Sequence, residues 1–253
     1  MSSTVKQSHT LFDHLLELRT RLLHAVLGVL VVFCSLVYFT QDIYQYVAQP
    51  LLTVMPADTQ MIATDVASPF FTPFKLTIVI SIFVAMPYIL YQLWSFIAPG
   101  LYKNEKRLVA PLMFGSTLLF YAGIAFAYYV VFPVVFAFFS SVAPDGVTIA
   151  TDISRYLDFV LKLFFAFGVA FEIPIAIILM CWTGVTSPDS LRAKRPYIVV
   201  AAFVVGMLLT PPDIISQTML AVPMLLLFEV GIIIASLYYR ADEDEESEPK
   251  EEQ

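Results

Sequence analysis

The sequence predicts an all-α integral membrane protein with six transmembrane helices. Of its 253 residues, 59% are hydrophobic and only 14% are charged, whereas a soluble domain has about 45–50% apolar and about 25% charged residues. The apolar residues also gather in runs long enough to cross a bilayer, and Pro211 and Pro212 separate the last two runs. This composition excludes disordered, collagenous and small disulfide-rich proteins, and also an ordinary soluble enzyme.

Six apolar runs give the predicted helices. A crossing needs roughly 20 mostly apolar residues for about 30 Å of hydrocarbon. The runs are Leu22–Thr40, Phe74–Ile97, Leu108–Phe132, Phe159–Trp182, Tyr197–Leu209 and Ile214–Tyr239. The fifth is only about 20 Å long at 1.5 Å per residue, so it either thins the bilayer or lies among neighbouring helices. A single re-entrant hairpin is the alternative for the last two runs, but their combined length suffices for two crossings.

Lysine and arginine predict the orientation of these helices. Eleven of the 14 basic residues lie before the first run, in the loops after the second and fourth runs, or in the tail; the others are Lys75, Arg155 and Lys162. The positive-inside rule therefore places both termini in the cytoplasm. This divides the chain into a cytoplasmic segment, residues 1–21, a membrane domain, residues 22–239, and a cytoplasmic tail, residues 240–253.

The formal net charge of −7 belongs to the tail. Residues 241–253 hold eight acids and one base, so the rest of the chain carries 13 charges of each sign. A tail of this composition is expected to be disordered, and the charge gives no reason to expect a nucleic-acid partner. Of the external segments, residues 41–72 are long enough for a structured cap with a short helix, and residues 143–158 form the other sizeable piece. Cys34 and Cys181 are predicted to be small core residues.

Two acidic residues lie among bases on the predicted cytoplasmic side. Glu17 belongs to an amphipathic segment before the first run and is four residues from Arg21, so the two can pair on a helix. Glu105 lies between Lys103 and Lys106. Either acid could belong to an ordinary solvated face. Alternatively, a carboxylate can take two parallel hydrogen bonds from a guanidinium, which lysine cannot reproduce, so two such acids could recognise a pair of arginines.

Ionisable and polar residues inside the later runs are the other candidates. Glu172 lies in the fourth run, where an ionisable group marks either a functional site or a protonated acid bonded to a neighbouring helix; Glu229 has the same ambiguity. Asp213 follows two prolines and is a good helix N-cap. Gln217 could bond within the chain or to a partner helix.

Several classes of function are disfavoured. All three histidines lie at or before the first run, and no serine–histidine or metal-ligand pair falls inside the helices, so we expect no enzyme, no metal and no cofactor. A proton-coupled secondary transporter of a small substrate, with Glu172 carrying the proton, is the alternative function. It would require further polar residues at the midplane, where the helices are almost uniformly apolar.

Several long motifs, in order, resemble the TatC family, the multispanning core of the twin-arginine protein translocase. They are HLLELRTRL, SPFFTPFKL, FIAPGLYKNEKR, FGVAFEIP, SPDSLRAKRPY and MLLTPPDIISQ. The resemblance covers about residues 10–239. It implies an inner-membrane protein of a Gram-negative bacterium, with six helices, a concave groove and both termini in the cytoplasm. It also implies a receptor that binds twin-arginine signal peptides, self-associates in a multi-copy complex with the single-span proteins TatA and TatB, and exports folded proteins with the proton-motive force.

The resemblance also implies roles for individual residues. The signal-peptide site corresponds to Glu17, Arg19, Phe96, Lys103 and Glu105. Glu172 corresponds to an intramembrane glutamate that faces the groove. The contacts with partner helices correspond to Met207, Thr210 and Gln217, and the positions associated with translocation correspond to Pro50 and Asp213.

Overall fold

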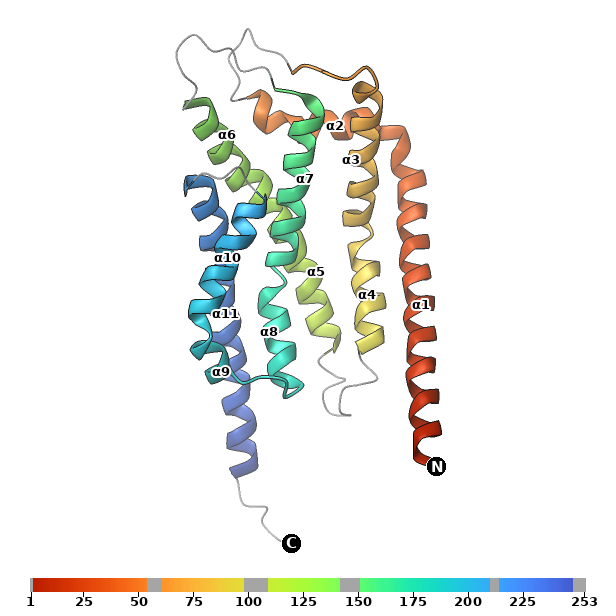
Figure 1. The fold of residues 1–253 in the computed structure, drawn as a ribbon, viewed down its shortest axis with the longest axis vertical. Helices are drawn as coiled ribbons and strands as arrows, with labels where there is room; N and C mark the ends of the chain where they lie inside the picture. Colours follow the sequence, from red (N-terminus) through yellow and green to blue (C-terminus); the bar gives the residue numbers. More distant parts are fainter. Residues whose placement is uncertain (1, 54–60, 98–108, 142–150, 210–213, 248–253) are drawn as a thin grey trace. The chain divides into compact units, whose positions relative to one another are not determined.

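The computed structural model describes residues 2–53, 61–97, 109–141, 151–209 and 214–247, and these are almost entirely helical (Figure 1). The α-helices are α1 (Ser2–Leu36), α2 (Thr40–Leu52), α3 (Ser68–Val84), α4 (Met86–Ile97), α5 (Val109–Phe126), α6 (Phe132–Ser141), α7 (Ile153–Ala170), α8 (Ile173–Trp182), α9 (Pro188–Ala193), α10 (Arg195–Leu209) and α11 (Ile214–Ser247). The predicted all-α class is therefore confirmed.

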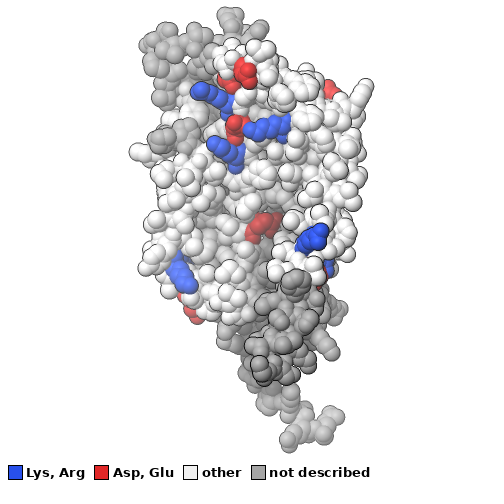
Figure 2. Space-filling model, turned by 45° about the vertical axis from the view of Figure 1, so that its right-hand side comes forward, with Lys and Arg blue, Asp and Glu red and all other residues white. Residues whose placement is uncertain are grey.

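The described helices fit a membrane protein. Four helical stretches are long and apolar enough to cross a bilayer, and there are five if α3 and α4 form one bent span. The four are Leu15–Leu52, Ala110–Phe139, Ile153–Trp182 and Gln217–Leu237. Large apolar side chains are widely exposed, such as Leu22 and Val31 on α1, and charged side chains are sparse on the face in Figure 2. Helix α10 is a shorter apolar helix of 15 residues. Six crossings remain a prediction.

Two predicted spans contain breaks, each beside a proline. The second is divided at Ala85, where α3 and α4 meet at 49°. Pro87 has no N–H for the Phe83 carbonyl and its ring crowds the preceding turn, which favours a break at this point. The fourth is divided between α7 and α8 at Phe171 and Glu172, where Pro174 likewise withholds an N–H.

Other boundaries differ from the predicted ones. The short helix predicted in the first external segment is present as α2. Helix α11 continues to Ser247, where an irregular tail was predicted from residue 240; alanine and glutamate favour helix enough to extend one that has already formed. Cys34 is exposed on α1, so its prediction as a core residue was wrong, whereas Cys181 is buried.

A π-helical segment, Ala127–Val131, connects α5 to α6. Phe120 in α5 and Ala127 at the start of the π-helical segment are buried; after the segment, Phe132 and Val135 are buried, whereas Val134 is 46% exposed. In a regular helix, the same side recurs every three or four residues. In the wider π-helical turn it recurs after five, from Ala127 to Phe132, so one side stays buried through the whole stretch.

The described chain divides into two compact units. The first contains residues 1–53, 57–117 and 150–157, and in it α1 packs against α3 and α4, while α2 packs against α3. The second contains residues 54–56, 118–149 and 158–253, and in it α11 packs against α8, α9 and α10. Glycines allow close approach within the second unit, since a Cβ on Gly123 would lie 2.4 Å from the Phe167 carbonyl oxygen.

Candidate functional site

Glu17 and Arg21 form an ion pair on α1. The Arg21 Nε and Nη2 atoms donate to the same Glu17 oxygen, Oε1, at 2.9 and 2.5 Å. The Arg21 side chain is 25% exposed and the Glu17 side chain is 36% exposed. The pairing predicted from the four-residue spacing is therefore confirmed, and the Glu17 carboxylate carries a guanidinium at a partly exposed position.

The other residues expected around Glu17 are only partly described. Arg19 is exposed on α1. Phe96 is half-buried in the last turn of α4, a helix that packs against α1. Lys103 and Glu105 lie outside the described residues, so the proximity of Glu105 to Glu17 remains a prediction.

Glu172 occupies the break between α7 and α8. It immediately precedes α8, its N–H donates to the Val169 carbonyl at 3.0 Å, and its side chain makes no hydrogen bond to the start of α8. The side chain is half-buried, and the Oε1 atom is buried. A proline-broken helix therefore carries an ionisable group in an apolar span, which is the arrangement expected of a functional position.

Gln217 connects the two helices of the C-terminal hairpin, which we define as α10 and α11. Its Nε2 donates to the Phe203 carbonyl at 2.8 Å. A Cβ on Gly206 would lie 3.1 Å from Gln217 Cγ, so the two helices approach closely here. Of the two alternatives, the bond within the chain is present, and the bond to a partner helix remains a prediction. Met207 is 51% exposed on α10, while Thr210 and Asp213 lie outside the described residues.

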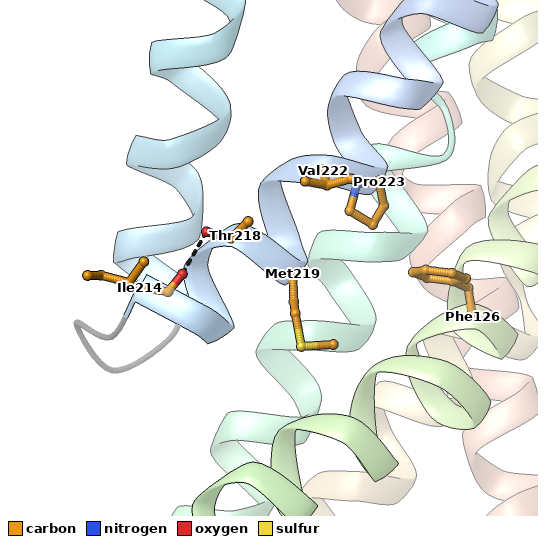
Figure 3. Close-up of a pocket in the computed structure, with 6 residues that line it drawn as sticks. All are labelled: Phe126, Ile214, Thr218, Met219, Val222 and Pro223. Atoms are coloured by element: carbon orange, nitrogen blue, oxygen red, sulfur yellow. Dashed lines mark hydrogen bonds between the residues drawn. The ribbon is translucent and has the colours of Figure 1, made fainter.

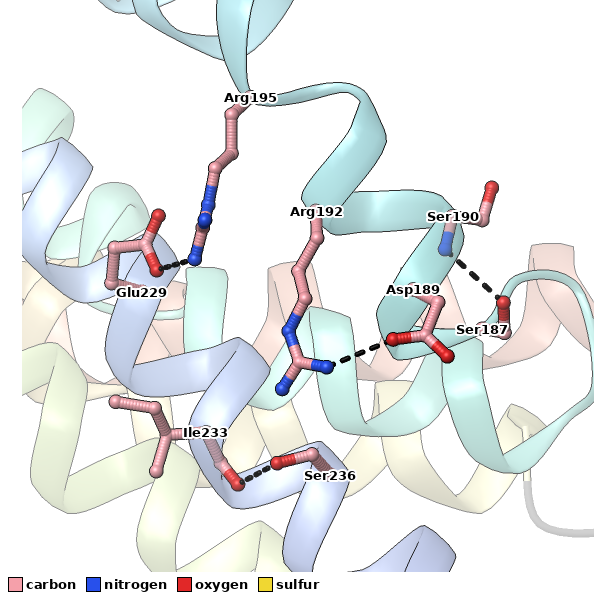
Figure 4. Close-up of polar contacts among 8 residues, drawn as sticks. All are labelled: Ser187, Asp189, Ser190, Arg192, Arg195, Glu229, Ile233 and Ser236. Atoms are coloured by element: carbon pink, nitrogen blue, oxygen red, sulfur yellow. Dashed lines mark hydrogen bonds and ion pairs between the residues drawn. The ribbon is translucent and has the colours of Figure 1, made fainter.

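An ion pair joins the same two helices at Arg195 and Glu229 (Figure 4). Arg195 Nη2 and Glu229 Oε2 are 2.5 Å apart, and the side chains are 48% and 39% exposed. Helix α9 next to it contains a local pair of Arg192 with Asp189 at 2.8 Å. Glu229 therefore has a basic partner on the neighbouring helix, an arrangement that neither of the two alternatives considered for it had included.

An apolar pocket of about 490 Å³ lies along the N-terminal part of α11 (Figure 3). Its lining residues are Phe126, Ile214, Thr218, Met219, Val222 and Pro223. The Thr218 hydroxyl donates to the Ile214 carbonyl at 2.7 Å, so it adds little polarity. Pro223 leaves the Met219 carbonyl without its helical donor. This pocket suits an apolar side chain or acyl chain rather than a charged substrate.

A polar cap, which we define as residues 40–53, 61–72 and 151–156, belongs to the first unit. The Asp152 carboxylate accepts hydrogen bonds from the Thr64 hydroxyl (2.6 Å) and N–H (3.0 Å), and from the N–H groups of Ser154 and Arg155 (2.9 and 3.0 Å). The Tyr156 hydroxyl donates to the Val47 carbonyl at 2.9 Å. Asp152 thus caps α7 and binds a segment 88 residues away.

The same hydrogen bonds change the acidity of Asp152. The Thr64 hydroxyl is the largest cause, and with the backbone N–H groups it lowers the pKa of the Asp152 carboxyl from 3.8 to about 2. Hydrogen bonds to a carboxylate favour its charged form. Pro50 lies inside α2 one turn after Val47, so the cap holds the helix that contains this predicted translocation-associated position.

The sequence reasoning missed Asp152 and the partner of Glu229. Asp152 directly precedes a helical apolar run, a recognisable N-cap signal. Ser187 followed by Pro188 is a similar signal for α9, where the Ser187 hydroxyl accepts from the Ser190 N–H at 3.2 Å. No local pattern pairs Arg195 with Glu229. Among the described residues, no group of histidine, cysteine, aspartate or glutamate side chains could hold a metal ion.

Comparison with known proteins identifies the family. Residues 13–223 match the family model described as TatC, Sec-independent protein translocase protein. The TatC protein of Haemophilus influenzae is 61% identical over 96% of this chain and 94% of its own length, and that of Escherichia coli K12 is 58% identical over 93% and 91%. A crystal structure of the twin-arginine translocase receptor TatC is 37% identical, with a TM-score of 0.79 over 88% of this chain and 98% of that one.

The names of these relatives describe protein transport. They describe neither an enzymatic reaction nor the transport of a small substrate, so they do not favour the alternative function considered above. The match extends over most of the chain, and the identity far exceeds that needed to infer common descent. The chain is therefore a member of the TatC family of Sec-independent protein translocase proteins.

Proposed function

We propose that this chain is the receptor subunit of a twin-arginine translocase, which binds the signal peptides of folded cargo proteins. One observation carries the proposal. The region that matches the family model, residues 13–223, contains every proposed site residue from Glu17 to Gln217. The relatives that match this chain are named as translocase proteins.

The signal peptide is recognised by carboxylates. Glu17 and Glu105 each bind one arginine of the twin pair, and Arg19, Lys103 and Phe96 complete the site. The partly exposed Glu17 carboxylate, which already binds a guanidinium, supports this assignment. A carboxylate and a guanidinium match in charge and in planar geometry, which a lysine ammonium does not.

The apolar part of the signal peptide then inserts along a groove near Glu172. The break between α7 and α8 supports this, because a backbone interrupted beside an ionisable group needs polar or hydrated surroundings. The proton-motive force drives the passage of the cargo, with Pro50 and Asp213 required for translocation.

The C-terminal hairpin receives the single-span partners TatA and TatB, and Met207, Thr210 and Gln217 form the contact. Its exposed Met207 and close-packed Gly206 support a helix-docking surface. The chain also associates with further copies of itself in this complex.

The protein lies in the bacterial inner membrane with both termini in the cytoplasm. With both termini on the same side, the number of crossings is even. We count six, and the short helix α10 is the fifth of them in chain order. At 15 residues, α10 is about 22 Å long, so the bilayer is locally thin around it.

Crosslinking of signal peptides tests the proposal. A photoreactive twin-arginine peptide should label the full chain, in membranes with its partners, several-fold more than the matched twin-lysine peptide. Glu105→Ala should weaken this labelling, whereas Asp189→Ala, which alters another exposed acid, should not. Equal labelling by the two peptides would contradict the proposed receptor function.

A further inference from the structure

We propose that Arg21 is a built-in competitor of the signal peptide for Glu17. The inference rests on the proposed function of Glu17 as an arginine-binding carboxylate. In the structure, the guanidinium that occupies this carboxylate comes from the same helix, four residues away. The incoming arginine and Arg21 therefore have the same chemistry and the same target atom.

The geometry makes Arg21 the residue for this role. Residues four apart lie on one face of a helix, whereas residues two apart do not; Arg21 therefore reaches Glu17, and Arg19 points elsewhere. Arg21 is the less exposed of the pair, at 25%, so its guanidinium is held close to the helix surface beside the carboxylate.

The contact is also one that a ligand can replace. Both Arg21 nitrogens donate to Oε1, so the pair lacks the parallel arrangement in which each guanidinium nitrogen has its own carboxylate oxygen. A guanidinium on a separate chain is not restricted by the helix and can adopt that stronger arrangement. The pair is also partly exposed, where ion pairs are weak. Arg21 thus neutralises Glu17 in the resting protein and yields to a signal peptide.

Competition has a defined consequence for affinity. An internal competitor lowers the apparent affinity of every ligand by the same factor, the inverse of the fraction of protein in which the site is open. For an exposed pair four residues apart on a helix, this factor is about twofold. Removing Arg21 also removes a positive charge beside the incoming cation, which extends the expected range to about fivefold. Selectivity for arginine over lysine should not change, because the competitor acts equally on both.

Peptide titration tests the inference. The full chain is assembled with its partners in nanodiscs and titrated with a labelled twin-arginine peptide and with its twin-lysine counterpart. Arg21→Gln should lower the Kd of both peptides by the same factor, between about two- and fivefold. Arg21→Lys, which keeps the charge, should give a smaller change. Arg192→Gln is the matched control, because Arg192 makes a similar helical pair with Asp189, and it should leave both Kd values unchanged.

The same substitution in a Glu17→Gln variant tests whether the Glu17 carboxylate is the group for which Arg21 competes. With Glu17→Gln already present, Arg21→Gln should have no further effect, since the competition requires the Glu17 carboxylate. An unchanged or higher Kd in Arg21→Gln, or a changed arginine-to-lysine ratio, would overturn the inference while leaving the receptor function in place. If the wild-type chain itself did not prefer the twin-arginine peptide, the proposed function would fail first.

Discussion

In the polar cap, hydrogen bonds join segments more than 80 residues apart in the sequence, from Thr64 to Asp152 and from Thr72 to Ser154. In the C-terminal hairpin, the described contacts between α10 and α11 include one amide hydrogen bond, one ion pair and close packing at Gly206. The difference follows from the surroundings. The irregular segments around Thr64 and Asp152 need specific hydrogen bonds to hold one conformation, whereas helices within lipid already satisfy their own backbone and associate through small residues and a few polar contacts.

The largest effect should come from packing in the hairpin. Gly206→Leu places a Cβ 3.1 Å from Gln217 Cγ and 3.2 Å from the Gln217 carbonyl oxygen, with three further carbons beyond it. Such overpacking should destabilise the hairpin by about 3 kcal/mol, measured as a lower apparent Tm in detergent. The adjacent Val205→Leu, at a partly exposed position, is the control. A stable Gly206→Leu protein would mean that close packing is not what holds the hairpin.

The next effect should come from hydrogen bonding in the cap. Asp152→Ala removes the acceptor of four hydrogen bonds from Thr64, Ser154 and Arg155. Local opening of the cap should become more frequent, so limited proteolysis between residues 61 and 67 should be roughly five- to tenfold faster. Asp42→Ala, at an exposed acid on α2, should cleave like the wild type. If both variants behaved alike, the Asp152 hydrogen bonds would not be what stabilises the cap.

A smaller effect is expected at the ion pair of the hairpin. Arg195→Glu and Glu229→Arg each place like charges together and should each destabilise the protein by about 1 kcal/mol, because the pair is half-exposed. The double charge reversal should recover most of this loss. A double variant no more stable than the single ones would show that the pair does not join α10 to α11.

The smallest effect should be the pH dependence of the stability of the cap, which appears only in acid. The pKa of Asp152 is lowered to about 2 in the folded protein from an ordinary value of 3.8. Its contribution to stability is therefore complete above about pH 4 and is lost as the pH falls toward 2. The difference in apparent Tm between wild type and Asp152→Asn should stay constant above pH 4 and shrink below it. A constant difference down to pH 2 would argue against the shifted pKa.

Local sequence patterns predicted some parts of this molecule and not others. The apolar runs located the long helices, and the four-residue spacing located the Glu17–Arg21 pair. The breaks beside Pro87 and Pro174 were not predicted, since both runs were expected to be continuous helices. The contacts of Asp152 with Thr64 and of Arg195 with Glu229 could not be predicted, because they depend on the tertiary packing of distant segments.

The π-helical segment between α5 and α6 determines which changes in length this stretch can accommodate. The segment places one more residue in a turn than a regular helix does, so deleting one residue from Ala127–Val131 would restore regular α-helical winding and leave the flanking helices facing as before. Deleting Pro133 from α6 would instead rotate everything that follows by 100°, and the buried Val135 would take the place of Val134, which is 46% exposed. A single-residue deletion should therefore be tolerated better within Ala127–Val131 than in the regular helix on either side of it.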